Sequence, residues 1–140
     1  MPDREELEAI VKQWIELGWR HGDTAVVDAL HAADFVDHDP GGRSPDNEGF
    51  KHGILDLYRA FPDLAATVED LVVDLEANTV AVRWSARGTH SGPYLGAPPS
   101  GRTITLKGVE IVRIRDGRIT ARWGEWDGMD LLAQLGRWTP

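Results

Sequence analysis

The spacing of hydrophobic residues changes once along the chain, shortly before its midpoint. In the first part, apolar residues recur every three or four positions, as on one face of a helix, and Leu7, Val11 and Trp14 are an example. In the second part, apolar and polar residues alternate as along a half-buried strand, with Val80 and Val82 among the apolar ones. Helices followed by antiparallel strands indicate an α+β fold. We expect a cone-shaped α+β barrel in which three N-terminal helices pack on a curved, mainly antiparallel sheet.

Capping and breaking residues place these elements along the chain. Asp3, Asp23 and Asp46 can each cap a following helix, and Pro62 ends the third one. The helices are expected at about 3–20, just after Asp23 and from 46 to 62, with a short terminal helix or turn at 128–136. The strands are expected at about 66–75, 78–89, 103–115 and 118–126.

Two long stretches rich in Gly, Pro and Asp or Ser are predicted to be loops. The first, residues 31–49, follows the second helix and has Phe35 and Val36 as its apolar anchor. The second, residues 91–102, joins two strands. A long loop at the end of a sheet commonly borders a binding site, so we expect this one to do so.

Asp116-Gly117 joins two apolar-rich runs and predicts a β-hairpin. Gly adopts positive φ without strain, and Asp can bond to its own backbone, so this pair is typical of a tight turn. In one register the turn has two residues, Arg115 pairs with Arg118, and Glu110 lies opposite Trp123.

The alternative register has a three-residue loop with Gly117 as the bulge residue. Ile114 then pairs with Arg118, and Glu110 lies opposite Arg122. We prefer this register because it gives Glu110 an opposite charge across the ladder. It also gathers a second, apolar set on the other face of the hairpin, namely Val109, Ile111, Ala121 and Trp123.

Glu110 is unusual because it interrupts an otherwise apolar run, Gly-Val-Glu-Ile-Val, in a predicted central strand. A carboxylate buried there without a partner would cost several kcal/mol. Glu110 is therefore expected either to form a structural ion pair with Arg122 or to line a wet cavity as a pocket carboxylate. The sequence leaves both interpretations open.

Charge and composition exclude several classes of protein. The chain has 15 basic and 23 acidic residues, a formal charge of −8 and no cluster of Lys or Arg, which argues against nucleic acid or an anionic membrane as a partner. It has no cysteine, so disulfides and thiol chemistry are excluded. The acidic N-terminus begins a helix without a signal peptide, and no apolar run approaches the roughly 20 residues that cross a bilayer. We expect a single domain, residues 1–140, in the cytoplasm.

Several short segments, in one order along the chain, carry a family resemblance. They are the Trp-x-x-x-x-Trp-x-x-Gly-Asp segment at 14–23, Asp-Phe-Val-Asp-His-Asp-Pro at 34–40, Phe-Pro-Asp-Leu at 61–64, Arg-Gly-Thr-His at 87–90 with Leu-Gly-Ala-Pro-Pro at 95–99, Asp-Gly-Arg-Ile at 116–119 with Trp-Asp at 126–127, and Leu-Ala-Gln-Leu-Gly at 132–136. Together they span nearly the whole chain. In them the sequence resembles the SnoaL-like polyketide cyclase family, within the nuclear transport factor two-like and ketosteroid isomerase-like superfamily.

The resemblance implies a cone-shaped barrel that forms a homodimer through its sheet. It also implies a pocket for a small hydrophobic, aromatic or polyketide-like molecule, with no metal or organic cofactor. The best-known members close a ring by intramolecular aldol condensation, using an aspartate as acid and base and a histidine on the neighbouring strand. By position these two residues fall on Gly124 and Glu110 here, while a pocket glutamine falls on Gly108 and a pocket aromatic residue on Trp19.

The cyclase constellation is thus not reproduced, and the remaining catalytic candidates are Glu110, Arg122 and His38, with Asp37 as a further acid. Glu110 could remove a proton next to a carbonyl group while Arg122 or His38 stabilises the enolate oxygen. Asp37-His38-Asp39 also suggests metal ligands, but no second His cluster accompanies it, so we expect no metal site. The expected substrate-binding residues are Trp19, Phe35, Trp84, Leu95 and Trp126.

Three functions are compatible with these candidates. The first is a cyclase-type lyase or isomerase that works by acid/base chemistry in an apolar pocket. The second is a hydrolase or a hydroxylation-type relative that acts on a polyketide or an epoxide. The third is a small-molecule binding protein without catalytic activity.

Overall fold

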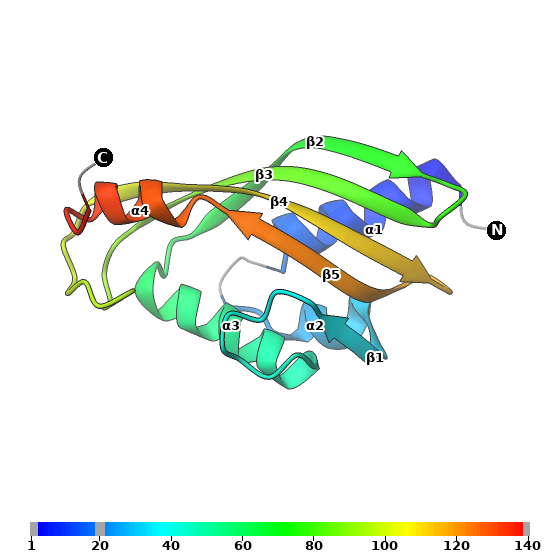
Figure 1. Cartoon of the computed structure of the whole chain (residues 1–140), viewed down its shortest axis with the longest axis horizontal. Helices are drawn as coiled ribbons and strands as arrows, with labels where there is room; N and C mark the ends of the chain where they lie inside the picture. Colours follow the sequence, from blue (N-terminus) through cyan, green and yellow to red (C-terminus); the bar gives the residue numbers. More distant parts are fainter. Residues whose placement is uncertain (1–2, 19–21, 139–140) are drawn as a thin grey trace.

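The computed structural model describes residues 3–18 and 22–138, and within them most helices precede a run of four consecutive strands, as in an α+β fold (Figure 1). The elements are α1 (Arg4–Glu16), α2 (Ala25–Leu30), β1 (His31–Asp37), α3 (Asn47–Ala60), β2 (Ala65–Asp74), β3 (Thr79–Thr89), β4 (Thr103–Arg115), β5 (Arg118–Trp126) and α4 (Gly128–Gln134). Among the helices in these residues, none has the length and apolar character that crossing a bilayer requires.

Two of the three predicted helix caps, Asp3 and Asp46, are confirmed, and Asp127 caps the terminal helix. The cap predicted at Asp23 is not, because the N-cap of the second helix is Thr24 and its side chain makes no capping bond. The Oδ1 atoms of Asp3, Asp46 and Asp127 each accept a hydrogen bond of 2.9 Å from a backbone N–H three residues further on. These bonds satisfy donors that the first turn of a helix leaves free. The three helices that carry these caps are α1, α3 and α4.

The sheet has five strands in the order β1-β5-β4-β3-β2. The four strands predicted from alternation pair with one another in antiparallel fashion, as expected. The fifth strand, β1, pairs in parallel with β5 and was not predicted. It occupies the first part of the stretch that we expected to be loop, because its Asp-rich composition conceals a strand with Phe35 and Asp37 buried and Val36 exposed.

The expected barrel and its three-helix cover are confirmed only in part. The sheet is open, with β1 and β2 as its two edges, and does not close on itself. The strand β1 intervenes between α2 and α3, and a fourth helix follows the sheet. Because β1 pairs only with β5, no ladder joins the two edge strands to close the sheet.

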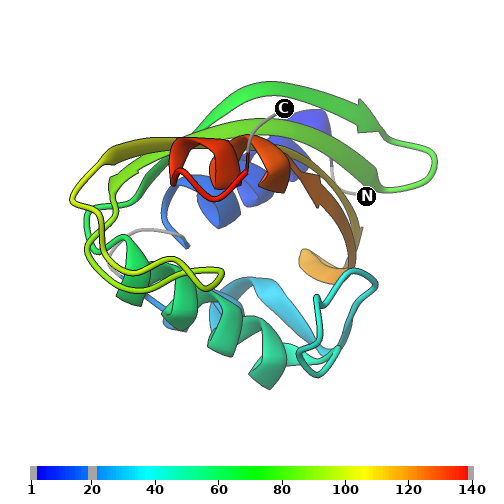
Figure 2. The ribbon, with the colours of Figure 1, turned by 60° about the vertical axis from the view of Figure 1, so that its left-hand side comes forward.

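The curved sheet arches over the helices, and the core lies between the two layers (Figures 1 and 2). Helix α1 packs against β2 and β3, whereas α2 and α3 lie against β1. The inner face of the sheet is buried and mostly apolar, with Val80, Val82, Leu106, Val112 and Ile119 among its residues.

The hairpin between β4 and β5 follows neither predicted register throughout. Arg115 pairs with Arg118 across a two-residue turn in which Asp116 and Gly117 have φ values of 51° and 76°. The preferred three-residue loop is therefore wrong, because this pair adopts the positive-φ geometry that a two-residue hairpin turn needs. A bulge then leaves Thr120 without a partner and shifts the pairing.

Beyond the bulge, Glu110 lies opposite Gly124 and Val112 lies opposite Arg122. Residues opposite each other project to the same face of a sheet, as do residues two apart on a strand. Glu110 and Arg122 therefore share the inner face, diagonally across the ladder. The outer face receives the predicted apolar set, in which Val109 and Ile111 are 45% and 42% exposed.

Candidate active site

A buried ion pair lies on the inner face of the β4–β5 hairpin. Glu110 is 2% exposed and Arg122 is 7% exposed. Arg122 Nη2 donates to Oε1 and Oε2 of Glu110 at 2.8 and 3.1 Å, and Arg122 Nε donates to Oε1 at 3.3 Å. Two donors of one guanidinium thus hold one carboxylate, which is a strong and well-oriented form of charge pairing.

A second carboxylate contacts the same guanidinium from the edge strand. Asp37 of β1 is the register partner of Arg122. Its buried Oδ1 accepts a hydrogen bond of 2.9 Å from Arg122 Nη1, and its Oδ2 lies 3.5 Å from Arg43 Nη2. Arg122 therefore lies between two buried acids, and one of them has a further cation beside it.

The absence of a side chain at Gly124 makes room for this pair. A Cβ atom built at Gly124 would overlap Glu110 Oε2 and Arg122 Nη2. The backbone N–H of Gly124 donates to Asp39 Oδ2 at 2.8 Å, which fixes this part of β5 against the segment after β1. The Glu110 carboxylate consequently occupies the space into which a side chain at position 124 would project.

Burial governs the charge state of the pair. Removal from water raises the pKa of Glu110 to about 7, although the positive charge of Arg122 lowers it, and Asp37 and Asp39 raise it further. Burial lowers the pKa of Arg122, but Glu110 and Asp37 outweigh this effect and raise it overall. Arg122 therefore keeps its charge, while Glu110 can gain or lose a proton near neutral pH, as a general base should.

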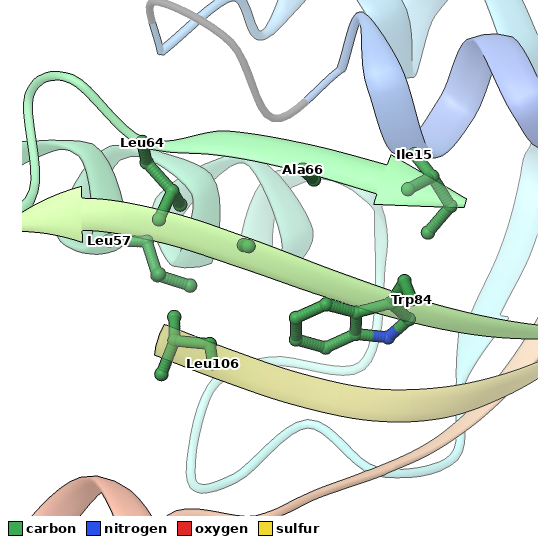
Figure 3. A pocket seen from close by; sticks show the side chains of 7 residues that line it. Ile15, Leu57, Leu64, Ala66, Trp84 and Leu106 are labelled. Carbon is green, nitrogen blue, oxygen red and sulfur yellow. The ribbon is translucent and has the colours of Figure 1, made fainter. Parts of the chain in front are cut away.

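A small apolar cavity lies further along the same face of the sheet (Figure 3). Its volume is about 20 Å³, enough for roughly one water molecule. The side chains that line it come from α1, α3, β2, β3 and β4 and from the turn before β2, and they are Ile15, Leu57, Leu64, Ala66, Trp84, Ala86 and Leu106.

Trp84 lies between this cavity and Glu110. It pairs with Gly108, and a Cβ atom at Gly108 would come within 2.7 Å of the Trp84 ring. Along the inner face of β4 the order is Leu106, Gly108, Glu110, and the indole covers the middle position. The path from the cavity to Glu110 along this face therefore passes Trp84.

The other predicted ligand contacts are dispersed. Trp126 pairs with Gly108 and is 40% exposed. Phe35 is buried in an aromatic cluster with His31, at a ring distance of 4.0 Å, and does not line the cavity. Leu95 is 49% exposed in the loop after β3. Trp19 lies outside the described residues.

His38 does not join Glu110 and Arg122. Its ring stacks on Trp123, with centroids 4.3 Å apart and planes 3° apart. Trp123 pairs with the exposed Ile111, so this contact belongs to the outer face of the sheet. Of the expected catalytic candidates, Glu110, Arg122 and Asp37 are thus brought together. His38 is not, because the chain turns away from the core directly after Asp37.

Sequence reasoning gave no role to His31 and no partner to Asp37. His31 is buried, accepts a hydrogen bond of 2.9 Å from Trp14 Nε1, and contacts Asn47 Oδ1 at 3.0 Å through Nδ1. These partners require a neutral ring with the proton on Nδ1, and burial lowers the pKa of His31 to about 4. Recognition of β1 as a strand beside β5 would have indicated the contact of Asp37 with Arg122.

Comparisons with known proteins agree with this architecture. The family model for SnoaL-like polyketide cyclase matches residues 9–135. IdmH, described as a putative polyketide cyclase from Streptomyces antibioticus, is 34% identical over 95% of this chain and 99% of its own, with a TM-score of 0.78. TsrD from Streptomyces laurentii is 26% identical over 99% of this chain and 100% of its own, with a TM-score of 0.88.

A third structure shares the fold. AclR, described as a putative hydroxylase from Streptomyces galilaeus, is 22% identical over 99% of this chain and 89% of its own, with a TM-score of 0.87. A comparison with curated proteins found no match. Because the family model covers most of the sequence, the chain belongs to the SnoaL-like polyketide cyclase family.

Proposed function

We propose that the protein is a cofactor-independent enzyme of the cyclase or isomerase type that acts on a small hydrophobic ketone. In this proposal Glu110 removes a proton from the carbon next to a carbonyl group, and Arg122 stabilises the negative charge that develops on the carbonyl oxygen. The observation that carries the proposal is the Glu110–Arg122 pair on the inner face, where burial raises the pKa of the acid to about 7.

The geometry of the pair suits enolate formation. Arg122 Nη2 contacts both oxygens of Glu110. A substrate carbonyl oxygen that replaces one of these contacts would bind the guanidinium, and its α-carbon would then lie beside the freed carboxylate oxygen. Proton transfer would neutralise Glu110 while the enolate oxygen took its place as the partner of Arg122. The buried charge would thus be conserved during the reaction.

The surroundings of the pair favour an apolar substrate. The cavity beyond Trp84 is lined by aliphatic side chains and by the indole itself. IdmH, which is 34% identical, is described as a putative polyketide cyclase, and this supports an aromatic or polyketide-like substrate here too. We expect such a molecule to displace Trp84, because the cavity holds only about 20 Å³.

A second function, ligand binding without turnover, is favoured by one observation. Both oxygens of Glu110 are occupied by Arg122, and the cavity along the inner face is small. A protein in which Glu110 serves only to neutralise Arg122 would bind an apolar molecule but leave it unchanged. The experiment below distinguishes the two functions.

Proton abstraction can be tested with 2-tetralone, a flat bicyclic ketone, by following hydrogen–deuterium exchange at its α-carbons in D₂O by NMR. We expect the wild-type protein to accelerate exchange over buffer, and Glu110→Gln to lose about 10²-fold of that rate or more, because general bases contribute on this scale. Glu125→Gln removes the same charge from an exposed position on β5 and should keep the wild-type rate.

The outcomes separate the two functions. Exchange that depends on Glu110 supports the enzyme. A wild-type protein that binds 2-tetralone in an NMR titration without accelerating exchange supports the binding protein. Equal acceleration by wild type and Glu110→Gln contradicts the proposed role of Glu110.

We also propose that two copies associate through the outer face of the sheet. An apolar row crosses four strands there, formed by Val72, Ala81, Ile111 and Trp123 in register. Val72 is 68% exposed and Ile111 is 42% exposed. An exposed apolar row in a regular sheet is the kind of surface that a second copy can cover.

A further inference from the structure

Arg122 divides its hydrogen bonds between two acids that lie on opposite sides of it. Nη1 donates to Asp37, whereas Nη2 and Nε donate to Glu110. The side chains of Asp37 and Glu110 are 0% and 2% exposed, so water screens neither contact appreciably. One positive charge therefore serves two buried carboxylates, and whatever binds one of them affects the other.

Asp37 is held in place independently of Glu110. Its Oδ1 also accepts a hydrogen bond of 2.9 Å from the backbone N–H of Asp39. Its Oδ2 faces Arg43, whose Nη1 is anchored at 2.8 Å to the carbonyl oxygen of Gly49 in α3. Asp37 can thus keep its hold on Arg122 while the contacts between Arg122 and Glu110 change.

We propose that Asp37 is a positioning residue: it fixes the Arg122 guanidinium and takes up part of its charge, so that Glu110 remains able to accept a proton. This inference rests on the proposed role of Glu110 as a base. If Asp37 were uncharged, the full charge of Arg122 would be available to Glu110 and would favour its ionised form. Glu110 would then hold a proton less tightly and would be a weaker base.

The other polar groups around the pair do not replace Asp37. Asp39 contacts this region through its Oδ2, which accepts from Gly124, and through its carbonyl oxygen, which accepts from Arg122 Nη1 at 3.1 Å. The charges of Asp37 and Arg122 also affect the pKa of His31 on β1, but the His31 ring is neutral near pH 7. The charged groups that face Glu110 within the described residues are therefore Arg122, Asp37 and Asp39, with Arg43 behind Asp37.

The test follows the Glu110 carboxyl carbon by ¹³C NMR between pH 4 and pH 9, with the signal assigned from Glu110→Gln. In Asp37→Asn we expect the titration midpoint to move to lower pH by about one unit, as for loss of a nearby like charge. Asn can still accept the bonds from Arg122 and Asp39 through its side-chain oxygen. Asp34→Asn is the matched control, because Asp34 also lies on β1 but pairs with Arg115 at the exposed surface.

A second variant has the opposite expected sign. Arg43→Gln removes the other cation beside Asp37, so Asp37 interacts more strongly with Arg122. Arg122 then stabilises the ionised form of Glu110 less, and the titration midpoint of Glu110 should move to higher pH. Arg115→Gln, which breaks the exposed pair with Asp34, should leave the midpoint unchanged. Loosened packing alone would not shift the midpoint in opposite directions in the two variants, and Arg43→Gln decides the matter if Asp37→Asn does not fold.

An unchanged or raised midpoint in folded Asp37→Asn overturns the inference, as does an unchanged or lowered midpoint in Arg43→Gln. The titration needs no substrate, so its outcome is separate from that of the ketone exchange. If the Glu110 midpoint shifts with the expected signs but 2-tetralone exchange is not accelerated, the electrostatic role of Asp37 is supported and the proposed enzymatic activity is contradicted. If exchange depends on Glu110 but the midpoint does not shift in these variants, the proposed enzymatic activity is supported and the role of Asp37 is contradicted.

Discussion

Glu110 is buried on the inner face of the sheet and must share its cation with another acid. Burial raises its pKa to about 7 in the folded protein, from an ordinary value of 4.5. Because the folded state binds this proton more tightly than the unfolded state, the contribution to stability is fully present below about pH 4.5. It is lost as the pH rises through about 7, which is opposite to the usual behaviour of a salt-bridged carboxylate.

This sign gives a stability prediction for Glu110→Gln. The free energy of unfolding of the wild type, minus that of the variant, should fall as the pH rises from about 4.5 to about 7, by at most 1.4 kcal/mol per pH unit. His31 has the opposite dependence, since its pKa is lowered to about 4, but it is present in both proteins and cancels. Urea unfolding at several pH values measures the difference, and a difference that rises with pH contradicts the assigned direction.

At the scale of the secondary-structure elements, the sequence predicted the helices and four strands closely because their signals are local. Aspartate caps and Pro62 mark helix ends, and alternation marks the strands. The strand β1 escaped prediction because it pairs in parallel with β5, which is distant in sequence. The position of Glu110 opposite Gly124 was not predicted, because a bulge at Thr120 shifts the pairing of β4 with β5 and no residue pattern in the hairpin indicates this bulge.

The candidate site could be predicted only as far as it depends on the two hairpin strands. Glu110 and Arg122 were recognised because a charge in an apolar run needs a partner. The contact of Asp37 with Arg122 could not be derived without β1, and the placement of His38 on the outer face follows from the same strand.

The hairpin makes Gly124 sensitive to substitution. In Gly124→Ala the new methyl group would collide with the buried ends of Glu110 and Arg122, so the ion pair must move. We expect a loss of about 1–3 kcal/mol in the free energy of unfolding, typical of overpacking. Gly128→Ala is the control, because its Cβ would be 3.5 Å from the nearest atom of Trp126, an ordinary contact. A Gly124→Ala protein as stable as Gly128→Ala would disprove the described packing.

Helix α4 protects the part of β4 that β5 does not reach. Gln134 accepts a hydrogen bond from the Thr105 N–H and donates one to the Thr105 carbonyl oxygen, both at 2.8 Å. In Gln134→Ala we expect the Thr105 amide to exchange with solvent about fivefold faster, because a hydrogen bond contributes about 1 kcal/mol. Gln13→Ala, at an exposed position on α1, should leave that amide unchanged, and equal exchange rates in the two variants would count against the contact.

At the scale of the whole molecule, the open sheet has one face covered by helices and an opposite face with an exposed apolar row. If two copies associate through this row, Ile111→Arg should convert the dimer to a monomer in sedimentation, because a buried, unpaired guanidinium is costly. Leu55→Arg introduces the same side chain at a nearly equal exposure, 41% against 42%, on α3. It should remain dimeric, and a wild-type monomer would exclude the proposed association.

The central claim is that the buried acid of this fold works as a base, and the pH dependence of 2-tetralone exchange tests it most directly. After subtraction of the buffer rate, kcat/KM for the wild type should rise with pH and level off above about 7, where Glu110 is ionised. Glu110→Gln should show no such rise. A wild-type profile that is flat between pH 5 and pH 9, or one that Glu110→Gln reproduces, would contradict the claim.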